Sequence, residues 1–214
     1  MNMKSLYYLI KGRRSVRAYK RKSVPISILK RILNAARWAP SAHNAQPWRF
    51  IIIEDEDSKY MLAKTMAHAW LKDLMSDGIP ENRAYEIIRK EAIERFTKSP
   101  VLILVCLTMK DMDMYSDERR NNAERTMAIQ SVAAAIQNLL LAAHYEGLGA
   151  CWVCAPLFCS KEVSRALSLP EDFEPQAIIT LGYPAEKPTA PPRKPLNEIV
   201  WVYSLSEGLK KWVV

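Results

Sequence analysis

The feature that most constrains the fold is a long helical segment that extends from Ser116 to Gly147. Ser116 predicts the N-cap, two acidic residues follow it in the first turn, and Gly147 predicts the end. A helix of roughly 30 residues spans about 45 Å. Between residues 132 and 143 this helix is apolar on nearly every side. Because so small a chain has few elements with which to cover such a helix, we expect a partner subunit to supply part of the cover.

The remaining pattern predicts helices and strands in loose alternation, which is typical of an α+β or α/β layer structure. Apolar runs predict strands at residues 48–53, 101–107, 149–153 and 176–181. Helical spacing predicts helices that end at Gly12 or lie at residues 25–38, 58–70, 80–96 and 160–167. We find no repeat or linker that would divide the chain, so we expect a single domain over residues 1–214.

The C-terminal region predicts an extended arm. Five prolines fall within the twelve residues 184–195. This composition favours a polyproline-like backbone that rises about 3.1 Å per residue, so the arm reaches more than about 30 Å. The arm leads into the apolar run 199–203, which has no evident hairpin partner nearby. We therefore expect that run to pair with a distant sheet edge, in its own subunit or in a neighbour.

The net charge of +8 raises the question of nucleic-acid binding. The excess is scattered, however, and acidic runs such as residues 54–57 lie among the basic ones. The densest basic patch comprises Arg13, Arg14, Arg17 and residues 20–22, which suits a small phosphate ligand equally well. We therefore expect no nucleic-acid partner. The apolar patch near the N-terminus is too short to span a membrane, so we also expect a cytoplasmic protein with no membrane partner.

The four cysteines leave three interpretations open. Cys151 and Cys154 have the spacing of a thioredoxin-like dithiol, but no helix is predicted directly after them. Cys151, Cys154 and Cys159 with His144 offer zinc ligands of the right type, although no second paired motif completes the set. Core cysteines, Cys106 among them, are the favoured interpretation, so we expect no metal. His144 is expected to carry a favourable charge at the C-terminus of the long helix.

Two segments carry the polar side chains from which a binding site could be built. If residues 13–17 are extended, Arg13, Ser15 and Arg17 point to one side, where two guanidinium groups flank a hydroxyl and suit a phosphate. Three solvated residues on a turn would show the same spacing. The second segment, residues 36–50, lies between a predicted helix and a predicted strand, and its prolines and short polar side chains favour a binding loop.

Four motifs, in this order along the chain, resemble those of the FMN-dependent nitroreductases. They are RRSVR at 13–17, APSAHNAQPW at 39–48, GLGACW at 147–152, and LGYP at 181–184 followed by RKP at 193–195. The resemblance implies an α+β fold with a central mixed sheet flanked by helices. It also implies an intertwined homodimer that exchanges C-terminal arms and holds two FMN sites at the subunit interface.

The resemblance implies that each FMN is bound by residues of both subunits. From one subunit, the phosphate and the ribityl chain would be bound by Arg13, Arg14, Ser15, Arg17 and Arg193. From the other subunit, a loop would approach the flavin with Pro40, Ser41, Ala42 and Asn44, and Gln46 would lie nearby. Cys154 and Ala155 occupy the positions where many relatives have Glu-Gly beside the flavin N5.

The function implied by the resemblance is that of a flavoprotein oxidoreductase. Bound FMN would pass electrons from NADH or NADPH to a small electron-poor acceptor, such as a nitroaromatic or a quinone. Because flavin carries the hydride, we expect no dedicated catalytic residue. One alternative follows from a likeness to the flavin domain of deazaflavin-coenzyme biosynthesis proteins, which implies a stand-alone FMN-dependent reductase of a dehydro precursor. A non-catalytic flavin-binding or sensor protein is the alternative of another class.

Overall fold

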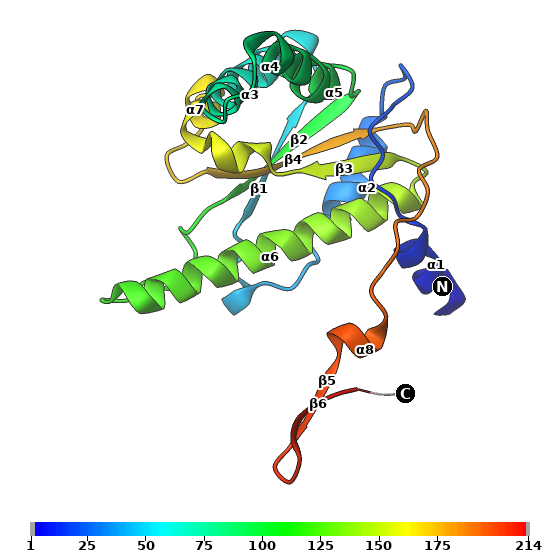
Figure 1. The fold of residues 1–214 in the computed structure, drawn as a ribbon, viewed down its shortest axis with the longest axis vertical. Coiled ribbons are helices and arrows are strands. Elements are labelled where there is room, and N and C mark those ends of the chain that lie inside the picture. Colours follow the sequence, from blue (N-terminus) through cyan, green and yellow to red (C-terminus); the bar gives the residue numbers. More distant parts are fainter. Residues whose placement is uncertain (1–2, 213–214) are drawn as a thin grey trace.

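The computed structural model describes residues 3–212, which form an α+β fold with a four-stranded sheet between two layers of helices (Figure 1). In chain order the elements are α1 (Met3–Gly12), α2 (Ile26–Ala36), η1 (Ala42–Asn44), β1 (Trp48–Ile53), α3 (Glu56–Ser76), α4 (Glu81–Ile88), η2 (Arg89–Glu94), α5 (Arg95–Thr97), β2 (Val101–Leu107), α6 (Glu118–Tyr145), β3 (Gly149–Val153), η3 (Ala155–Phe158), α7 (Ser160–Ala166), β4 (Glu174–Gly182), α8 (Leu196–Ile199), β5 (Trp201–Ser204) and β6 (Gly208–Lys211). The description of residues 1–214 as one domain stays a prediction.

The main sheet has the strand order β1-β2-β4-β3, and its three ladders are antiparallel. A parallel bridge between Ser15 and Ala150 adds one more segment beside β3 and makes the sheet mixed, as the resemblance implied. All four predicted strands are present, and β4 begins at Glu174, slightly earlier than predicted. The central pair, β2 and β4, is buried along almost its whole length.

The side chains of β2 alternate between two hydrophobic cores. Val101, Ile103 and Val105 pack with residues of α2 and α6 on one face of the sheet. Leu102 and Leu104 pack with residues of α3 and α7 on the other face. Figure 1 shows α6 along one face and α3, α4, α5 and α7 grouped over the other. A strand that is buried on both faces needs a continuous apolar run, and this requirement made β2 predictable.

Several helices differ from their predicted bounds. For α3 and α6 the reason is an N-cap residue that the apolar pattern does not reveal. α3 begins before its predicted start, since the Asp55 carboxylate accepts a hydrogen bond from the Ser58 backbone N–H at 2.8 Å. The N-cap of α6 is Asp117, so the prediction of Ser116 as the cap was wrong. The predicted helix at residues 80–96 is interrupted by η2, a π-helical turn.

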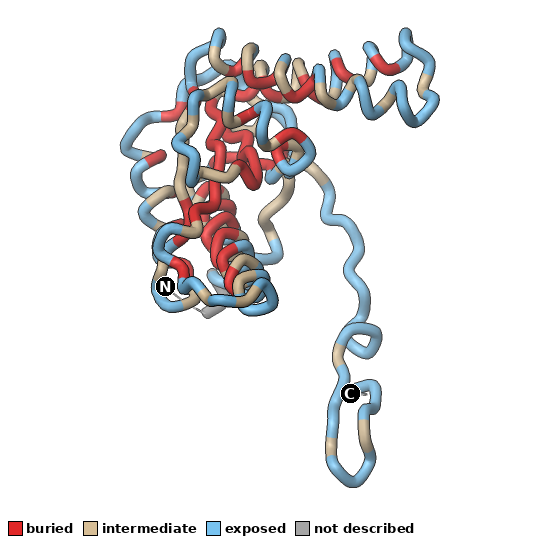
Figure 2. Tube along the Cα trace, turned by 90° about the vertical axis from the view of Figure 1, so that its left-hand side faces the viewer, coloured by how far each residue is buried: buried red, intermediate tan, exposed pale blue. Residues whose placement is uncertain are grey.

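One side of α6 is packed and the other remains accessible in a single subunit (Figure 2). Leu139 and its neighbours at helical spacing are buried against α2 and the sheet. On the outer side, Ile129 is 41% exposed and Gln137 is exposed, while Ala133 and Leu141 are half-buried. These four residues lie four positions apart and form one row along the helix. The subunit alone therefore does not provide the full cover that the sequence predicts for this helix.

By length and composition α6 also resembles a membrane-spanning helix, with a mean hydropathy of 1.4 over its most apolar window. This is weak evidence for a membrane, because the core helix of a soluble protein has the same properties. The packing of α6 against α2 and the sheet accounts for the apolar residues on its inner side.

The C-terminal arm leaves the body of the subunit as an extended segment, as its prolines predict (Figures 1 and 2). Beyond it, β5 and β6 form an antiparallel hairpin in which Trp201 pairs with Lys211 and Ser204 with Gly208. The prediction that the run 199–203 lacks a local partner was therefore wrong. The sequence did not reveal the partner because β6 is short and carries two lysines, and because the turn depends on Gly208 at a φ of 66°.

Candidate cofactor site

Residues 13–17 run alongside β3 as an added edge of the sheet. The Val16 backbone N–H donates a hydrogen bond to the Ala150 carbonyl at 3.0 Å, and Ser15 forms the parallel bridge to the same residue. Gly149 permits this approach, because a Cβ at that position would lie 2.7 Å from the Cβ of Val16. Backbone pairing with β3 therefore fixes the course of this segment.

The residues predicted to bind phosphate surround one cavity of about 300 Å³. They are Arg13, Arg14, Ser15, Arg17 and Arg193. Thr189 and prolines of the C-terminal arm complete the lining. The C-terminal arm thus places Arg193 beside residues 13–17, which lie near the N-terminus. Several guanidinium groups around one small cavity give it a positive potential, which favours an anionic group.

Local hydrogen bonds hold residues 13–17, here called the cationic segment, in place. The Arg14 guanidinium donates to the Lys11 carbonyl at 2.6 Å. The Glu186 carboxylate accepts hydrogen bonds from the backbone N–H groups of Arg17, at 2.5 Å, and Ala18, at 3.1 Å, and so fixes the arm to the segment. Sequence reasoning missed Glu186, because no pattern distinguishes one acidic residue in a proline-rich arm from a solvated one.

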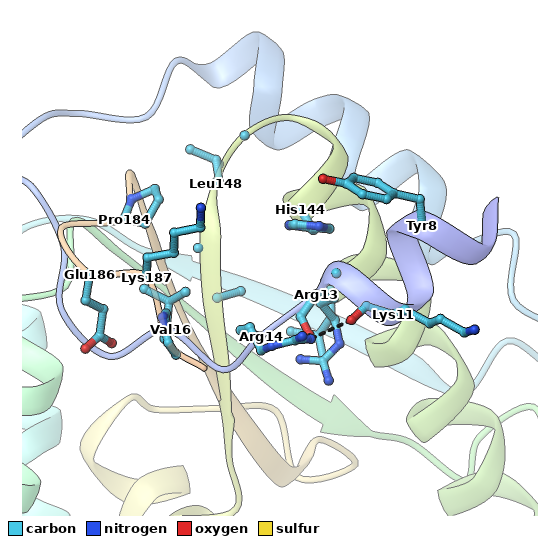
Figure 3. A pocket seen from close by; sticks show the side chains of 16 residues that line it. Tyr8, Lys11, Arg13, Arg14, Val16, His144, Leu148, Pro184, Glu186 and Lys187 are labelled. Carbon is cyan, nitrogen blue, oxygen red and sulfur yellow. Dashed lines mark hydrogen bonds between the residues drawn. The ribbon is translucent and has the colours of Figure 1, made fainter. Parts of the chain in front are cut away.

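A larger cavity of about 570 Å³ adjoins the same segment (Figure 3). Arg13 and Arg14 line both cavities, and His144 lines the larger one from the last turn of α6. A Cβ on Gly12 would lie 3.0 Å from the His144 Nε2, so α1 meets this ring closely and a larger residue would require the ring to shift. Burial, and then the charges of Arg13 and Arg14, lower the pKa of His144 below its ordinary value of 6.5. His144 is therefore neutral near pH 7, and the prediction of a charged residue was wrong.

Cys154 and Ala155 follow directly after β3 and lie outside the arginine-lined cavity. Cys154 is exposed, and Ala155 lines a third cavity of about 400 Å³ that α3, η2, α5 and η3 enclose. The aromatic rings of Trp70 and Phe158 and the guanidinium of Arg95 also line this cavity. β3 connects the arginine-lined cavity with the cavity beside Ala155. The beginning of β3 pairs with the cationic segment, and its last residue directly precedes Cys154.

Three of the four cysteines are core residues, as favoured from the sequence, whereas Cys154 is exposed. Burial raises the pKa of Cys106 to about 12 and that of Cys159 to about 11. It also raises the pKa of Cys151, so these three thiols stay protonated at neutral pH. All four thiols are free. The zinc set of three cysteines with His144 is not assembled anywhere in residues 3–212.

The polar loop at residues 40–46 is fixed to the middle of α6, away from the cationic segment at the end of that helix. The Ala42 backbone N–H donates to the Ser131 hydroxyl of α6 at 3.2 Å. Within the loop, the Ser41 hydroxyl accepts a hydrogen bond from the Gln46 backbone N–H at 3.1 Å. The loop therefore has a defined shape and a defined support.

This loop also stores backbone strain. His43, Asn44 and Gln46 have φ angles of 54°, 54° and 49°, which lie in the left-handed region that non-glycine residues rarely adopt. Such residues are frequent at functional sites. None of the predicted loop residues lines the arginine cavity; these are Pro40, Ser41, Ala42, Asn44 and Gln46. One subunit therefore holds the two halves of the predicted site apart.

Comparison with known families identifies the fold. The profile of the nitroreductase family matches residues 10–183, most of the chain. The chain belongs to the nitroreductase family. The matched region includes the cationic segment, the polar loop and β3, and it ends just before the proline-rich arm.

Similar proteins align with nearly the whole chain. A BluB-like flavoprotein from Clostridium difficile 630 is 25% identical, with a TM-score of 0.78 over 93% of this chain and 99% of its own. An iodotyrosine deiodinase, solved with FMN and 3-iodo-L-tyrosine, is 28% identical, with a TM-score of 0.68 over 89% of this chain and 95% of its own. A Methanothermobacter thermautotrophicus protein, provisionally named as an NADH dehydrogenase/NAD(P)H nitroreductase, is 34% identical over 84% of this chain and 77% of its own length.

Proposed function

We propose that this nitroreductase-family protein binds FMN and passes electrons from NADH or NADPH to a small electron-poor acceptor. The observation that carries the proposal is the convergence of Arg13, Arg14, Ser15, Arg17 and Arg193 on one small cavity. These residues come from opposite ends of the chain, and no structural core requires so many guanidinium groups together. A bound anion offsets their mutual repulsion.

The residues around this cavity fit the phosphate end of FMN. Guanidinium groups donate paired hydrogen bonds to phosphate oxygens, and the Ser15 hydroxyl adds a neutral donor. β3 leads from Ser15 toward Cys154 and Ala155, whose backbone we assign to the flavin ring. When bound, FMN supplies the redox chemistry, and the protein supplies binding, orientation and exclusion of water.

We further propose that the active form is a homodimer in which the loop at residues 40–46 completes the flavin site of the partner. The distance that one subunit keeps between this loop and the arginine cavity supports the proposal. The accessible row on α6, which includes Ile129, offers a surface for a second copy. The C-terminal hairpin offers another, because Trp201 is 50% exposed and Leu205 is 95% exposed. Isolated hairpins with uncovered apolar residues are marginal in water, so a partner is needed to stabilise this one.

We infer that the acceptor binds in the cavity of about 400 Å³ beside Ala155. Trp70 and Phe158 provide aromatic surfaces against which a planar molecule can stack. Arg95 also lines this cavity and forms an ion pair with Glu91. A guanidinium at this place would attract a nitro or quinone oxygen, which favours those acceptor classes.

The first experiment is an absorption spectrum of the purified protein, before and after addition of FMN. It is followed by anaerobic titration with NADH and with NADPH. We expect flavin bands, bleaching by at least one nicotinamide, and steady-state turnover with menadione, nitrofurazone or 3-iodo-L-tyrosine. Absence of flavin bands after FMN addition would contradict the whole proposal. If the flavin is bleached once, in stoichiometric amount, and no acceptor is turned over, the protein is a non-catalytic flavin-binding protein and not an oxidoreductase.

A further inference from the structure

A second cluster of polar side chains lies where the loop at residues 40–46 meets the N-terminal part of α6. The His43 Nε2 atom lies 3.3 Å from an Oε1 of Glu124 and 3.9 Å from an Oδ2 of Asp113. The three potential ligand atoms all lie within 4.8 Å of one another. One imidazole and two carboxylates thus converge from a loop, from the segment between β2 and α6, and from α6 itself.

The burial of Glu124 is an independent sign of a missing ligand. Glu124 is only 2% exposed, and its second carboxylate oxygen, Oε2, is buried without any hydrogen-bond partner. Taking a carboxylate out of water costs several kcal/mol unless a cation or hydrogen-bond donors replace the lost water. His43 contacts only the other oxygen, Oε1. The contact with His43 alone therefore leaves one oxygen of the buried carboxylate without a partner.

The backbone holds His43 in the position that this cluster needs. Its φ of 54° is left-handed, and the following Asn44 shares that conformation. The hydrogen bond from the Ala42 N–H to Ser131 anchors the loop beside it on α6. Strain of this kind persists only where neighbouring contacts enforce it. The loop thus directs the His43 imidazole, whose side chain is 44% exposed, at a buried carboxylate.

We propose that His43, Asp113 and Glu124 form a binding site for a divalent transition-metal ion, with Zn²⁺ as the best match. Zinc binds imidazole nitrogen and carboxylate oxygen at about 2.0–2.2 Å, so ligand atoms around a tetrahedral ion lie about 3.4 Å apart. The separations of 3.3 Å and 3.9 Å are near this value before any ligand adjusts. The Asp113 side chain is 60% exposed, so the fourth position faces solvent and accommodates water. A cation here also compensates the free oxygen of Glu124.

The direct test measures Zn²⁺ binding by equilibrium dialysis and Co²⁺ binding by visible absorption, on the full-length protein as purified. All variants carry Cys154→Ser, because this exposed thiol competes for zinc. We expect one Zn²⁺ per chain and intense tetrahedral Co²⁺ bands. His43→Ala, Asp113→Asn and Glu124→Gln are each expected to weaken Zn²⁺ binding at least about tenfold. Glu124→Gln preserves the shape of the buried side chain, so circular dichroism can verify that this variant folds.

Matched controls separate this site from other zinc ligands on the surface. His68→Ala removes an exposed histidine outside the cluster, and Asp111→Asn removes a carboxylate that pairs with Arg49 instead. Both controls are expected to bind Zn²⁺ as tightly as the Cys154→Ser protein. The proposal is wrong if the Cys154→Ser protein, in which all the other changes are made, binds no Zn²⁺. It is also wrong if His43→Ala and Glu124→Gln bind Zn²⁺ as tightly as the controls. Neither outcome depends on flavin, so the metal site and the proposed oxidoreductase activity are tested separately.

Discussion

Val16 and Gly149 pack so closely that a side chain at position 149 would begin 2.7 Å from the Val16 Cβ. This contact holds the cationic segment flat against β3, where the Val16 N–H reaches the Ala150 carbonyl. The direction in which Arg13, Ser15 and Arg17 point is set by this pairing. A contact without any polar atom therefore controls the geometry of the proposed phosphate site.

Gly149→Ala is expected to force the segment away from β3. We expect the free energy of unfolding to fall by about 1–3 kcal/mol, as for other overpacked sites, and FMN affinity to fall with it. Denaturant unfolding and flavin fluorescence titration measure the two effects. Adding Val16→Gly to Gly149→Ala removes all the clashing side-chain atoms of Val16, its Cβ included, so the double variant should be more stable than the sum of the single effects predicts. Strict additivity would show that this contact does not position the segment.

Arg193→Gln should weaken FMN binding without affecting riboflavin binding. Arg193 lines the cavity with Arg13, Arg14 and Arg17, and we assign all four to the phosphate, which riboflavin lacks. A hydrogen bond to a charged group contributes about 1.5–3 kcal/mol, so affinity for FMN should fall at least about tenfold. Lys194→Gln removes an adjacent cation that does not line this cavity and serves as the control. If the affinities for FMN and riboflavin fell equally, Arg193 would not bind the phosphate.

Mixing two variants with weakened flavin binding, at an FMN concentration that neither retains alone, tests whether each flavin site combines two subunits. Arg193→Gln damages the phosphate cavity, and Asn44→Ala damages the loop that we assign to the partner. In a heterodimer of the two variants, one site receives both defects and the other site is intact. Random pairing makes half of the dimers mixed, so co-refolding should restore about a quarter of wild-type flavin binding. A site built within one subunit would recover nothing, because every chain would carry a defect.

The strands and the main helices could be predicted because burial leaves a direct trace in the sequence. The run at Val101 is apolar at every position, since both faces of β2 are covered. Caps and turns leave weaker traces, because Asp117 and Ser116 are both suitable N-caps and only the backbone decides between them. The hairpin strand that includes Lys210 escaped notice for a similar reason, since its pairing depends on a turn at Gly208 rather than on apolar residues.

The candidate site could be predicted only in part. The convergence of Arg193 with Arg13 was expected from the family resemblance, and no spacing within one segment reveals it. Glu186, which holds the arm against the cationic segment, carries no sequence signal at all. The buried, half-satisfied carboxylate of Glu124 was also unpredictable, because it sits in the charged first part of α6, where a solvated residue is the ordinary expectation. Tertiary contacts, rather than local pattern, determine these three features.

His144 should make stability depend on pH in a direction opposite to that of a charged helix-terminal histidine. Its pKa in the folded protein lies below the ordinary 6.5, because burial and the charges of Arg13 and Arg14 disfavour the protonated form. The neutral ring therefore contributes fully above about pH 6.5, and its contribution is lost as the pH falls through the lower folded-state pKa. Between about pH 7 and pH 5, the melting temperature of the wild type should fall more steeply than that of His144→Gln.

The same histidine reports on the proposed phosphate site. An FMN phosphate held by Arg13 and Arg14 would offset the two charges that lower the pKa of His144. An NMR titration of the His144 ring should therefore give a higher pKa with FMN than without it, whereas riboflavin should leave the value unchanged. The distinction matters, because a flavin ring packed against His144 itself would lower the pKa further by excluding water. A downward shift with FMN would place the phosphate away from these two arginines, even if the flavin binds tightly.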